Sequence, residues 1–241
     1  MRTWKKLTMI PMTRLAMKIL NGFVFYVDWL WYDAWAFYPF IFVRKNLRSE
    51  RSIINHERIH IRQQIDIHVA ISIPIIIVSL LLEVFAKINL VCFLCFVPFI
   101  PTLFYAFDVL CTMTYLRQKY GSWCLPFGYV RANTSFEKEA IWNAEDEKYL
   151  RHRKFWAVIS YTKKITLTGD STQDAYSELF NLPKGSVFKI ASDYETVMRR
   201  IEEYTPQNVV FEVFPINPGT VLYTMYGPDH NIVTKNDKTE D

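Results

Sequence analysis

Two long apolar stretches constrain the fold of this chain more than any other feature of its sequence. Residues 67–82 and 90–107 contain no Asp, Glu, Lys or Arg, and only the seven residues EVFAKIN separate them. A helix needs about 20 mostly apolar residues to cross a bilayer. We therefore expect two membrane spans, at about 67–85 and 89–110, joined as a helical hairpin. The alternative is a pair of buried helices in a water-soluble core.

Basic residues flank this apolar region on both sides. Residues 1–66 hold eleven Lys and Arg and residues 111–154 hold eight, whereas the connector holds only Lys87. Because basic residues beside membrane helices favour the cytoplasmic side, we expect both flanks and both termini in the cytoplasm. The net charge of +4 is too small for the dense basic face that binds nucleic acid. The expected partner is a lipid bilayer, with no nucleic acid.

The segments on either side of the spans have other patterns. Residues 22–43 are rich in aromatic residues but contain Asp28 and Asp33, which favours an interfacial segment over a third span. Within it, AFYPFIFVR at residues 36–44 is predicted to form one short strand. Residues 133–156 have acidic residues near the start and basic residues near the end, so we expect one soluble helix there.

The C-terminal part of the chain changes in composition. From about residue 157, strand-like stretches such as NVVFEVFP alternate with helical patterns such as DYETVMRRIEEY. We expect a small α+β domain over residues 157–228 and a polar tail over 229–241, after a membrane-embedded domain of residues 1–156. The predicted fold class is a mainly α membrane protein.

The stretch NHERIHIRQQ, at residues 55–64, directly precedes the first span and contains the pattern H-E-x-x-H. His56 and His60 stand four residues apart, so a helix places both imidazoles on one face, as two ligands of a zinc tetrahedron. Glu57 stands beside the first histidine, where a carboxylate can take a proton from the attacking water. The alternative is a solvated amphipathic helix with two hydrogen-bonded histidines.

A catalytic zinc site needs a third protein ligand, and acidic residues follow the second span on the same side of the membrane. Glu137 and Glu139, in TSFEKEA, are the main candidates. Asp66 and Asp108 are weaker ones, because Asp66 has the wrong helical register and Asp108 lies inside the predicted second span.

These motifs, NHERIHIRQQ and SFEKEAIWNAEDEKYLRHRKFW around two apolar segments, resemble a group of small bacterial integral-membrane proteins. Those proteins carry H-E-x-x-H-x-x-Q-Q, a helical hairpin and N-x-x-F-E-x-E-A. The motifs are similar to those of gluzincin metallopeptidases, including the CAAX-prenyl-protease-like membrane enzymes, whose third zinc ligand is a glutamate in E-x-E-A-D. Matching the alanine to Ala140 implies Glu137 as the ligand and Glu139 as the alternative. The resemblance covers about residues 20–156.

The resemblance implies a zinc metallopeptidase in the inner membrane of a bacterium, with one zinc ion and its site on the cytoplasmic side. One position departs from the pattern: Ile141 stands where the family has an aspartate that would orient a ligand histidine. That role is left to Asn143 or Glu139, and the departure also allows metal binding with little turnover. Three interpretations of Arg62, Gln63 and Gln64 stay open: they fix the tautomer of the second histidine, they pair with acidic groups, or they form an interfacial polar turn.

Two functions are therefore open at this point. The first is hydrolysis of a peptide or membrane-protein substrate, with Glu57 as the base and the strand 36–44 as an edge that pairs with an extended peptide. The second is a non-catalytic zinc-binding membrane anchor whose C-terminal α+β domain is an interaction module. The sequence indicates neither the cleavage specificity nor the oligomeric state.

Overall fold

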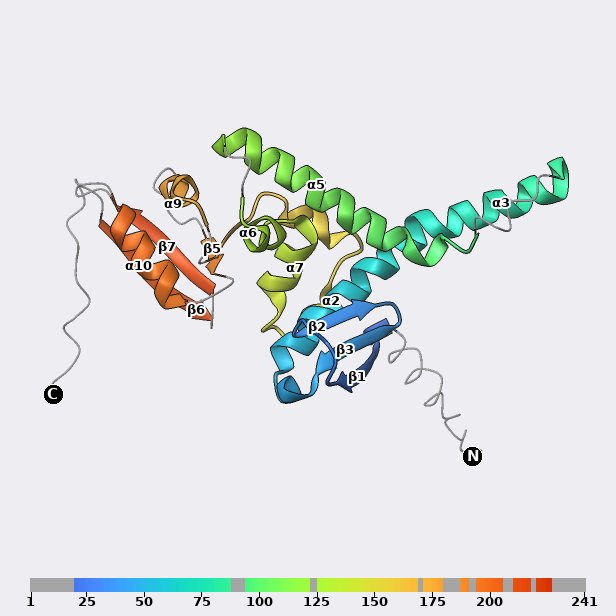
Figure 1. Ribbon diagram of the computed structural model, residues 1–241, viewed down its shortest axis with the longest axis horizontal. Helices are drawn as coiled ribbons and strands as arrows, with labels where there is room; N and C mark the ends of the chain where they lie inside the picture. Colours follow the sequence, from blue (N-terminus) through green and yellow to red (C-terminus); the bar gives the residue numbers. More distant parts are fainter. Residues whose placement is uncertain are drawn as a thin grey trace, which may run out of the picture. The chain divides into compact units, whose positions relative to one another are not determined.

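In a computed structural model, the chain forms two compact units (Figure 1). Unit 1 comprises Met1–Thr114 and Thr134–Lys163, and unit 2 comprises Tyr115–Asn133 and Lys164–Asp241. The structure describes residues 20–87, 94–121, 125–168, 171–179, 187–190, 194–205, 210–217 and 220–226. The chain is mainly helical, as predicted.

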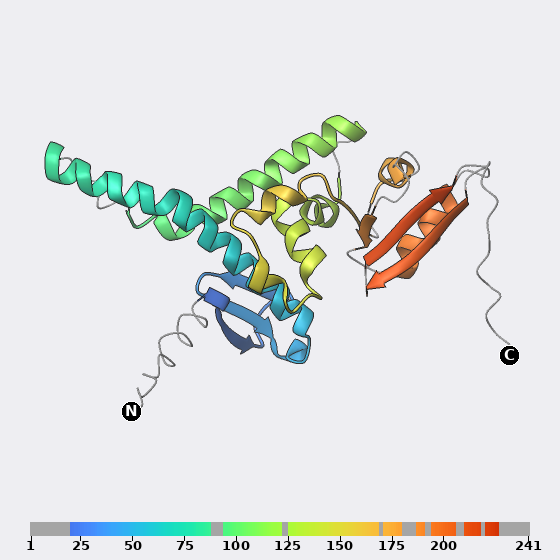
Figure 2. The same cartoon turned by 180° about the vertical axis from the view of Figure 1, so that it is seen from behind.

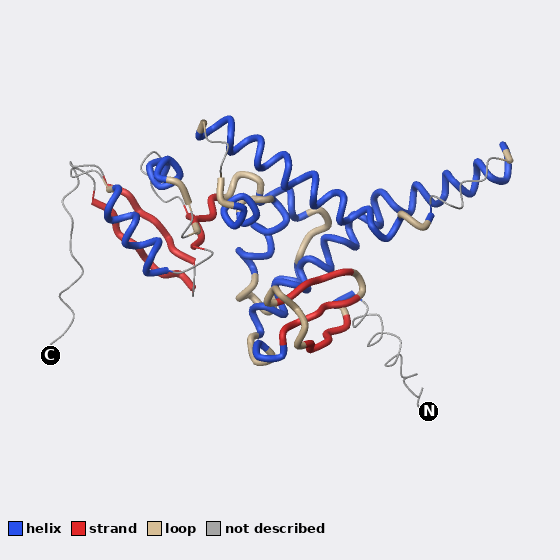
Figure 3. Tube along the Cα trace, viewed as in Figure 1, coloured by secondary structure: helices blue, strands red, loops and turns tan. Residues whose placement is uncertain are grey.

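A three-stranded sheet begins unit 1, where the sequence predicted only one strand. Its strands are β1 (Phe23–Val27), β2 (Ala34–Phe37) and β3 (Phe40–Arg44), in the order β1-β3-β2 (Figure 3). β3 pairs parallel with β1 and antiparallel with β2. The prediction of one strand over 36–44 is wrong because Tyr38 and Pro39 form the turn of a hairpin, and Pro cannot donate to a ladder.

The two faces of this sheet have different surroundings. Ile41 and Val43 alternate along β3 and pack fully buried with Ile61 of the following helix, so the sheet lies against that helix (Figures 1 and 2). The other face is aromatic: Phe42 packs against Phe25 and Trp35. Period-two alternation thus gives the sheet one aliphatic face that covers the helix and one aromatic face.

The helix that carries H-E-x-x-H continues into the first apolar stretch. α2 (Arg51–Ile67), a π-helical turn (His68–Ser72) and α3 (Ile73–Ala86) form one 36-residue helix. Many large apolar side chains of α3 are exposed, and the 36-residue helix that contains α3 is long and apolar enough to cross a membrane. Exposing so many apolar side chains to water is unfavourable, whereas lipid accommodates them.

The second candidate span begins later than predicted. A 3-10 turn (Val97–Phe99) leads into α5 (Ile100–Tyr120), and the 24 residues Val97–Tyr120 are also long and apolar enough to cross a membrane. The predicted span 89–110 therefore differs from this helix at both ends, and residues 88–93 lie outside the described ones. Pro98 lies in the first turn, where a missing N–H is tolerated. The antiparallel hairpin stays a prediction.

The segment predicted as one helix over 133–156 is broken into shorter elements. α7 (Ser135–Asn143) is followed by α8 (Tyr149–His152) and by a 3-10 helix (Ala157–Tyr161). At the end of α7, Nδ2 of Asn143 donates to the carbonyl of Glu139 at 2.7 Å. The prediction of one continuous helix over 133–156 is wrong, because side-chain hydrogen bonds to the last carbonyls of α7 end this helix at Asn143.

Unit 2 combines short helices with a second sheet. Its sheet has the order β4-β5-β7-β6, with β4 parallel to β5 and the other pairs antiparallel. The core contains Leu167, Tyr176, Phe188, Val197 and Ile201. The elements are α6 (Phe127–Ala132), β4 (Ile165–Leu167), α9 (Gln173–Leu179), β5 (Val187–Ile190), α10 (Tyr194–Tyr204), β6 (Val210–Asn217) and β7 (Thr220–Tyr226). The predicted tail, 229–241, lies outside the described residues.

Candidate metal centre

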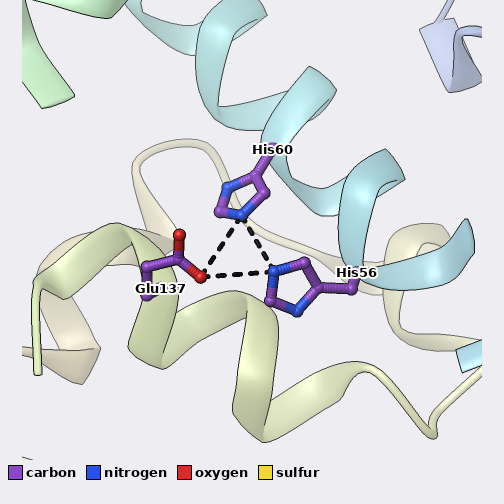
Figure 4. Close-up of side chains that lie close together, drawn as sticks. All are labelled: His56, His60 and Glu137. Atoms are coloured by element: carbon purple, nitrogen blue, oxygen red, sulfur yellow. Dashed lines mark hydrogen bonds and ion pairs between the residues drawn. The ribbon is translucent and has the colours of Figure 1, made fainter. Parts of the chain in front are cut away.

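Three predicted ligands converge between α2 and α7 (Figure 4). The Nε2 atoms of His56 and His60 lie 3.0 Å apart, because both project from one face of α2. Oε2 of Glu137, in the first turn of α7, lies 3.3 Å from Nε2 of His56 and 3.6 Å from Nε2 of His60. In the part of the chain that the structure describes, this is the one group of three or more His, Cys, Asp or Glu that could hold a metal ion.

The spacing and chemistry of these atoms fit zinc. Ligand atoms about 2.0–2.1 Å from a tetrahedral zinc are about 3.3 Å from one another, and the three observed separations, 3.0, 3.3 and 3.6 Å, bracket that value. Two imidazole nitrogens and one carboxylate oxygen are also a donor set that catalytic zinc sites use, with a fourth position left open. The residues present therefore fit the metal that the sequence predicted.

The position of α7 is set by bonds at its N-terminus. Thr134 caps the helix by accepting from the backbone N–H of Glu137 at 3.3 Å. Oδ2 of Asp108, on α5, accepts from the N–H of Ser135 at 2.8 Å. These bonds satisfy N–H groups that have no partner within the helix. Asp108, a weak ligand candidate from sequence, thus binds the end of α7 and is absent from the metal group.

Tyr105 contacts the metal group from α5. Its hydroxyl donates to Oε1 of Glu137 at 3.0 Å, which leaves Oε2 directed at the two histidines. Tyr105 lies one helical turn before Asp108, so one face of α5 holds both the end of α7 and the Glu137 side chain. Nothing in the local sequence around Tyr105 distinguishes it from the other aromatic residues of the second apolar stretch, and sequence reasoning missed it.

Glu139, the alternative ligand, is bound elsewhere. Its side chain is completely buried, and its carboxylate accepts from the guanidinium of Arg153 and from the hydroxyl of Tyr149. Arg153 also donates to Oδ2 of Asp66 at 2.7 Å. Two residues apart on a helix, Glu137 and Glu139 point to different sides of α7. Asp66 and Glu139 therefore share one buried arginine and do not belong to the metal group.

His60 and Glu137 perturb each other's protonation when no metal is present. His60 precedes the apolar stretch, and although burial alone would lower its pKa, the charge and hydrogen bond of Glu137 raise it to about 9. Burial likewise opposes the charged form of Glu137, yet His60 and His56 hold its pKa well below its usual range. The metal-free site therefore contains an imidazolium–carboxylate pair at neutral pH.

Glu57, the predicted base, is buried in α2 directly after His56. Its negative charge is among the causes that raise the pKa of His60, which places its carboxylate within electrostatic reach of the site.

Other residues of the motif hold neighbouring elements to α2. Gln64 accepts from the N–H of Tyr38 at 2.8 Å and donates to the carbonyl of Ala36 at 3.0 Å. Asn55 lies within α2, and its Nδ2 donates to the carbonyls of Asn143 and Ala144 at the end of α7. Nδ1 of His68 lies within hydrogen-bond distance of Oγ of Ser72, at 2.9 Å, and His68 does not belong to the metal group.

The sheet also corrects the prediction that residues 36–44 form an edge strand that pairs with a substrate peptide. β3, which contains most of residues 36–44, is paired on both sides and cannot add a strand. The outer side of β2 is engaged at Ala36 and Tyr38 by the side chain of Gln64. A peptide therefore cannot pair with β3, and it cannot pair with this part of β2 while Gln64 stays bound.

Comparison with known proteins adds no further constraint. No family model matches the sequence, and no significant match was found among curated proteins or solved structures.

Proposed function

We propose that this protein is a membrane-bound zinc metallopeptidase. One observation carries the proposal: Nε2 of His56, Nε2 of His60 and Oε2 of Glu137 converge from two helices. Glu57 adjoins them on α2 in the order that H-E-x-x-H requires for a carboxylate base. A purely structural zinc site has four protein ligands, whereas three leave a position open for chemistry.

The chain's own residues divide the work of hydrolysis. His56, His60 and Glu137 would hold one zinc ion, which would supply Lewis acidity toward a carbonyl oxygen and activate water near neutral pH. Glu57 would accept the proton of the attacking water and pass it to the leaving amine. Tyr105 would keep the Glu137 carboxylate oriented through its hydrogen bond to Oε1.

The location of the site supports a membrane or membrane-proximal peptide as the substrate. His60 stands only seven residues before the apolar stretch that starts at Ile67, on the same continuous helix. The distribution of Lys and Arg favours a cytoplasmic site and cytoplasmic termini, and the family resemblance implies a bacterial inner membrane. A peptide emerging from the bilayer on that side would reach the site at the membrane surface.

Zinc content and one substitution test this function. Purified protein in detergent should contain one zinc per chain by elemental analysis, and absence of zinc would refute the proposal. Wild-type protein incubated with solubilised bacterial membrane proteins should create new N-termini detectable by mass spectrometry. Glu57→Gln should keep the zinc and create none, because an amide cannot accept the proton.

The alternative is a zinc-binding membrane anchor without catalysis, whose unit 2 is an interaction module. The separate hydrophobic core of unit 2 favours this reading. The non-catalytic alternative is supported if wild type and Glu57→Gln both bind zinc and neither produces new N-termini.

A further inference from the structure

Gln63 connects the metal group to a buried ion pair. Its Oε1 lies 2.7 Å from Nδ1 of His60. Its Nε2 donates to the carbonyl of Phe136 at 2.9 Å and to Oε2 of Glu139 at 3.0 Å. The side chain is almost completely buried, with 2% of its surface exposed. Gln63 therefore bridges α2 and α7 directly behind one of the candidate ligands.

The two partners of its nitrogen fix the orientation of this amide. A backbone carbonyl only accepts hydrogen bonds, and so does a carboxylate paired with Arg153, so both must face the NH₂ group of Gln63. Flipping the amide would direct its oxygen at two acceptors. Oε1 is consequently held toward His60, where it can only accept, so Nδ1 of His60 carries a proton.

Glu139 is itself held firmly, which makes it a fixed anchor for Gln63. Arg153 donates to both of its oxygens and also to Asp66 on α2. The hydrogen bonds and charges of Glu139 and Asp66, acting against burial, raise the pKa of Arg153, so the guanidinium stays charged. A buried, charged and multiply bonded partner restricts the Gln63 amide to one orientation.

We infer that Gln63 is a positioning residue that holds His60 with its proton on Nδ1 and its Nε2 lone pair directed at the metal. Glu139 and Arg153 enforce this arrangement. The inference rests on metal binding, which the proposed function requires, and does not depend on peptide cleavage.

The neighbouring glutamine provides a matched control. Gln63→Met removes the bonds to His60, Phe136 and Glu139, whereas Gln64→Met removes the bonds to Tyr38 and Ala36 and leaves His60 untouched. Zinc affinity of the full chain in detergent is measured by competition with a chromophoric chelator. We expect Gln63→Met to weaken zinc binding about 10–100-fold and Gln64→Met to change it less than about threefold. Equal effects of the two substitutions overturn the inference.

A spectroscopic measurement on wild-type protein tests the inference without relying on a folded variant. Zinc-loaded protein with ¹⁵N-labelled histidine should show His60 with a protonated Nδ1 and a coordinated Nε2. Coordination through Nδ1 refutes the inference. Failure of the zinc-loaded protein to cleave peptides would contradict the proposed function while leaving both of these measurements interpretable.

Discussion

Oε2 of Glu137 lies 3.3 Å from Nε2 of His56, although the two residues are far apart in the sequence and lie on different helices. The contact exists because α7 packs against α2. The side chains of Asn55 and Gln63, on α2, donate hydrogen bonds to backbone carbonyls of α7. Binding of a metal ion by this group would therefore be coupled to the packing of these two helices. A ligand that joins α2 to α7 should stabilise the folded chain by mass action.

The two glutamates of α7 should respond differently to the same substitution. Glu137→Gln replaces a carboxylate ligand with a weaker amide ligand, so we expect loss of stoichiometric zinc in elemental analysis. The amide oxygen can still accept from Tyr105, but loss of the imidazolium–carboxylate pair should lower thermal stability in excess chelator. This loss should be smaller than that of an arginine partner, because His60 can become neutral whereas Arg153 stays charged.

Glu139→Gln should instead act on folding. It removes one of the two negative partners of a buried arginine, and breaking such a buried pair reduces the free energy of unfolding by up to about 3–5 kcal/mol. Thermal unfolding in excess chelator measures this loss independently of zinc. A stable Glu139→Gln protein that lacks zinc would show that Glu139, rather than Glu137, is the ligand.

The imidazolium–carboxylate pair predicts how the metal-free protein titrates. His60 should lose its proton at about pH 9 in a ¹⁵N NMR titration, because Glu137 stabilises the charged imidazole. Zinc must displace this proton. Between pH 7 and pH 9, zinc affinity should therefore rise about tenfold per pH unit, while Glu137, whose pKa is lowered, contributes no further proton.

Glu137→Gln is the control for this titration in zinc-free protein. Without the carboxylate, burial dominates, and the pKa of His60 should fall below that of the wild type. An unchanged midpoint would mean that the two side chains do not interact in solution.

Local spacing was sufficient to predict the histidine pair and the apolar helices. An H-E-x-x-H pattern brings His56 and His60 together on any helix, whatever the rest of the fold. Apolar length likewise predicts candidate spans at the level of composition. The spacing E-x-E, by contrast, offered two glutamates, and only the packing of α7 decides which of them faces α2.

Contacts over long sequence separations could not be predicted in the same way. The partner of Glu139 is Arg153, which reaches it only because the chain turns after Asn143. The aromatic segment was predicted to end in one strand, but it forms three, because β3 pairs with β1 and, across the Tyr38–Pro39 turn, with β2. Strand pairing depends on residues that the segment's own pattern does not specify.

Asn55 should contribute measurably to stability. Its Nδ2 donates to the carbonyls of Asn143, Ala144 and Asp146, and its side chain is buried. Asn55→Ala leaves buried carbonyls without this donor, so we expect the free energy of unfolding to fall by about 1–3 kcal/mol. Asn46→Ala, at an exposed position, should change it by less than about 0.5 kcal/mol in the same denaturation assay. Equal effects would contradict a bridging role for Asn55.

Two isoleucines with similar exposure can show whether α3 lies in lipid. Ile77, in α3, is 51% exposed and Ile159, outside both apolar stretches, is 65% exposed. In reconstituted vesicles of a chain whose own cysteines are replaced by serine, we compare Ile77→Cys with Ile159→Cys. A water-soluble maleimide reacts with the thiolate, which does not form in hydrocarbon. Ile77→Cys should therefore react at least about tenfold more slowly than Ile159→Cys. Both side chains are exposed in the structure, so packing does not protect either position from the reagent. Equal rates of maleimide labelling would therefore mean that α3 is in water and the chain is not anchored through it.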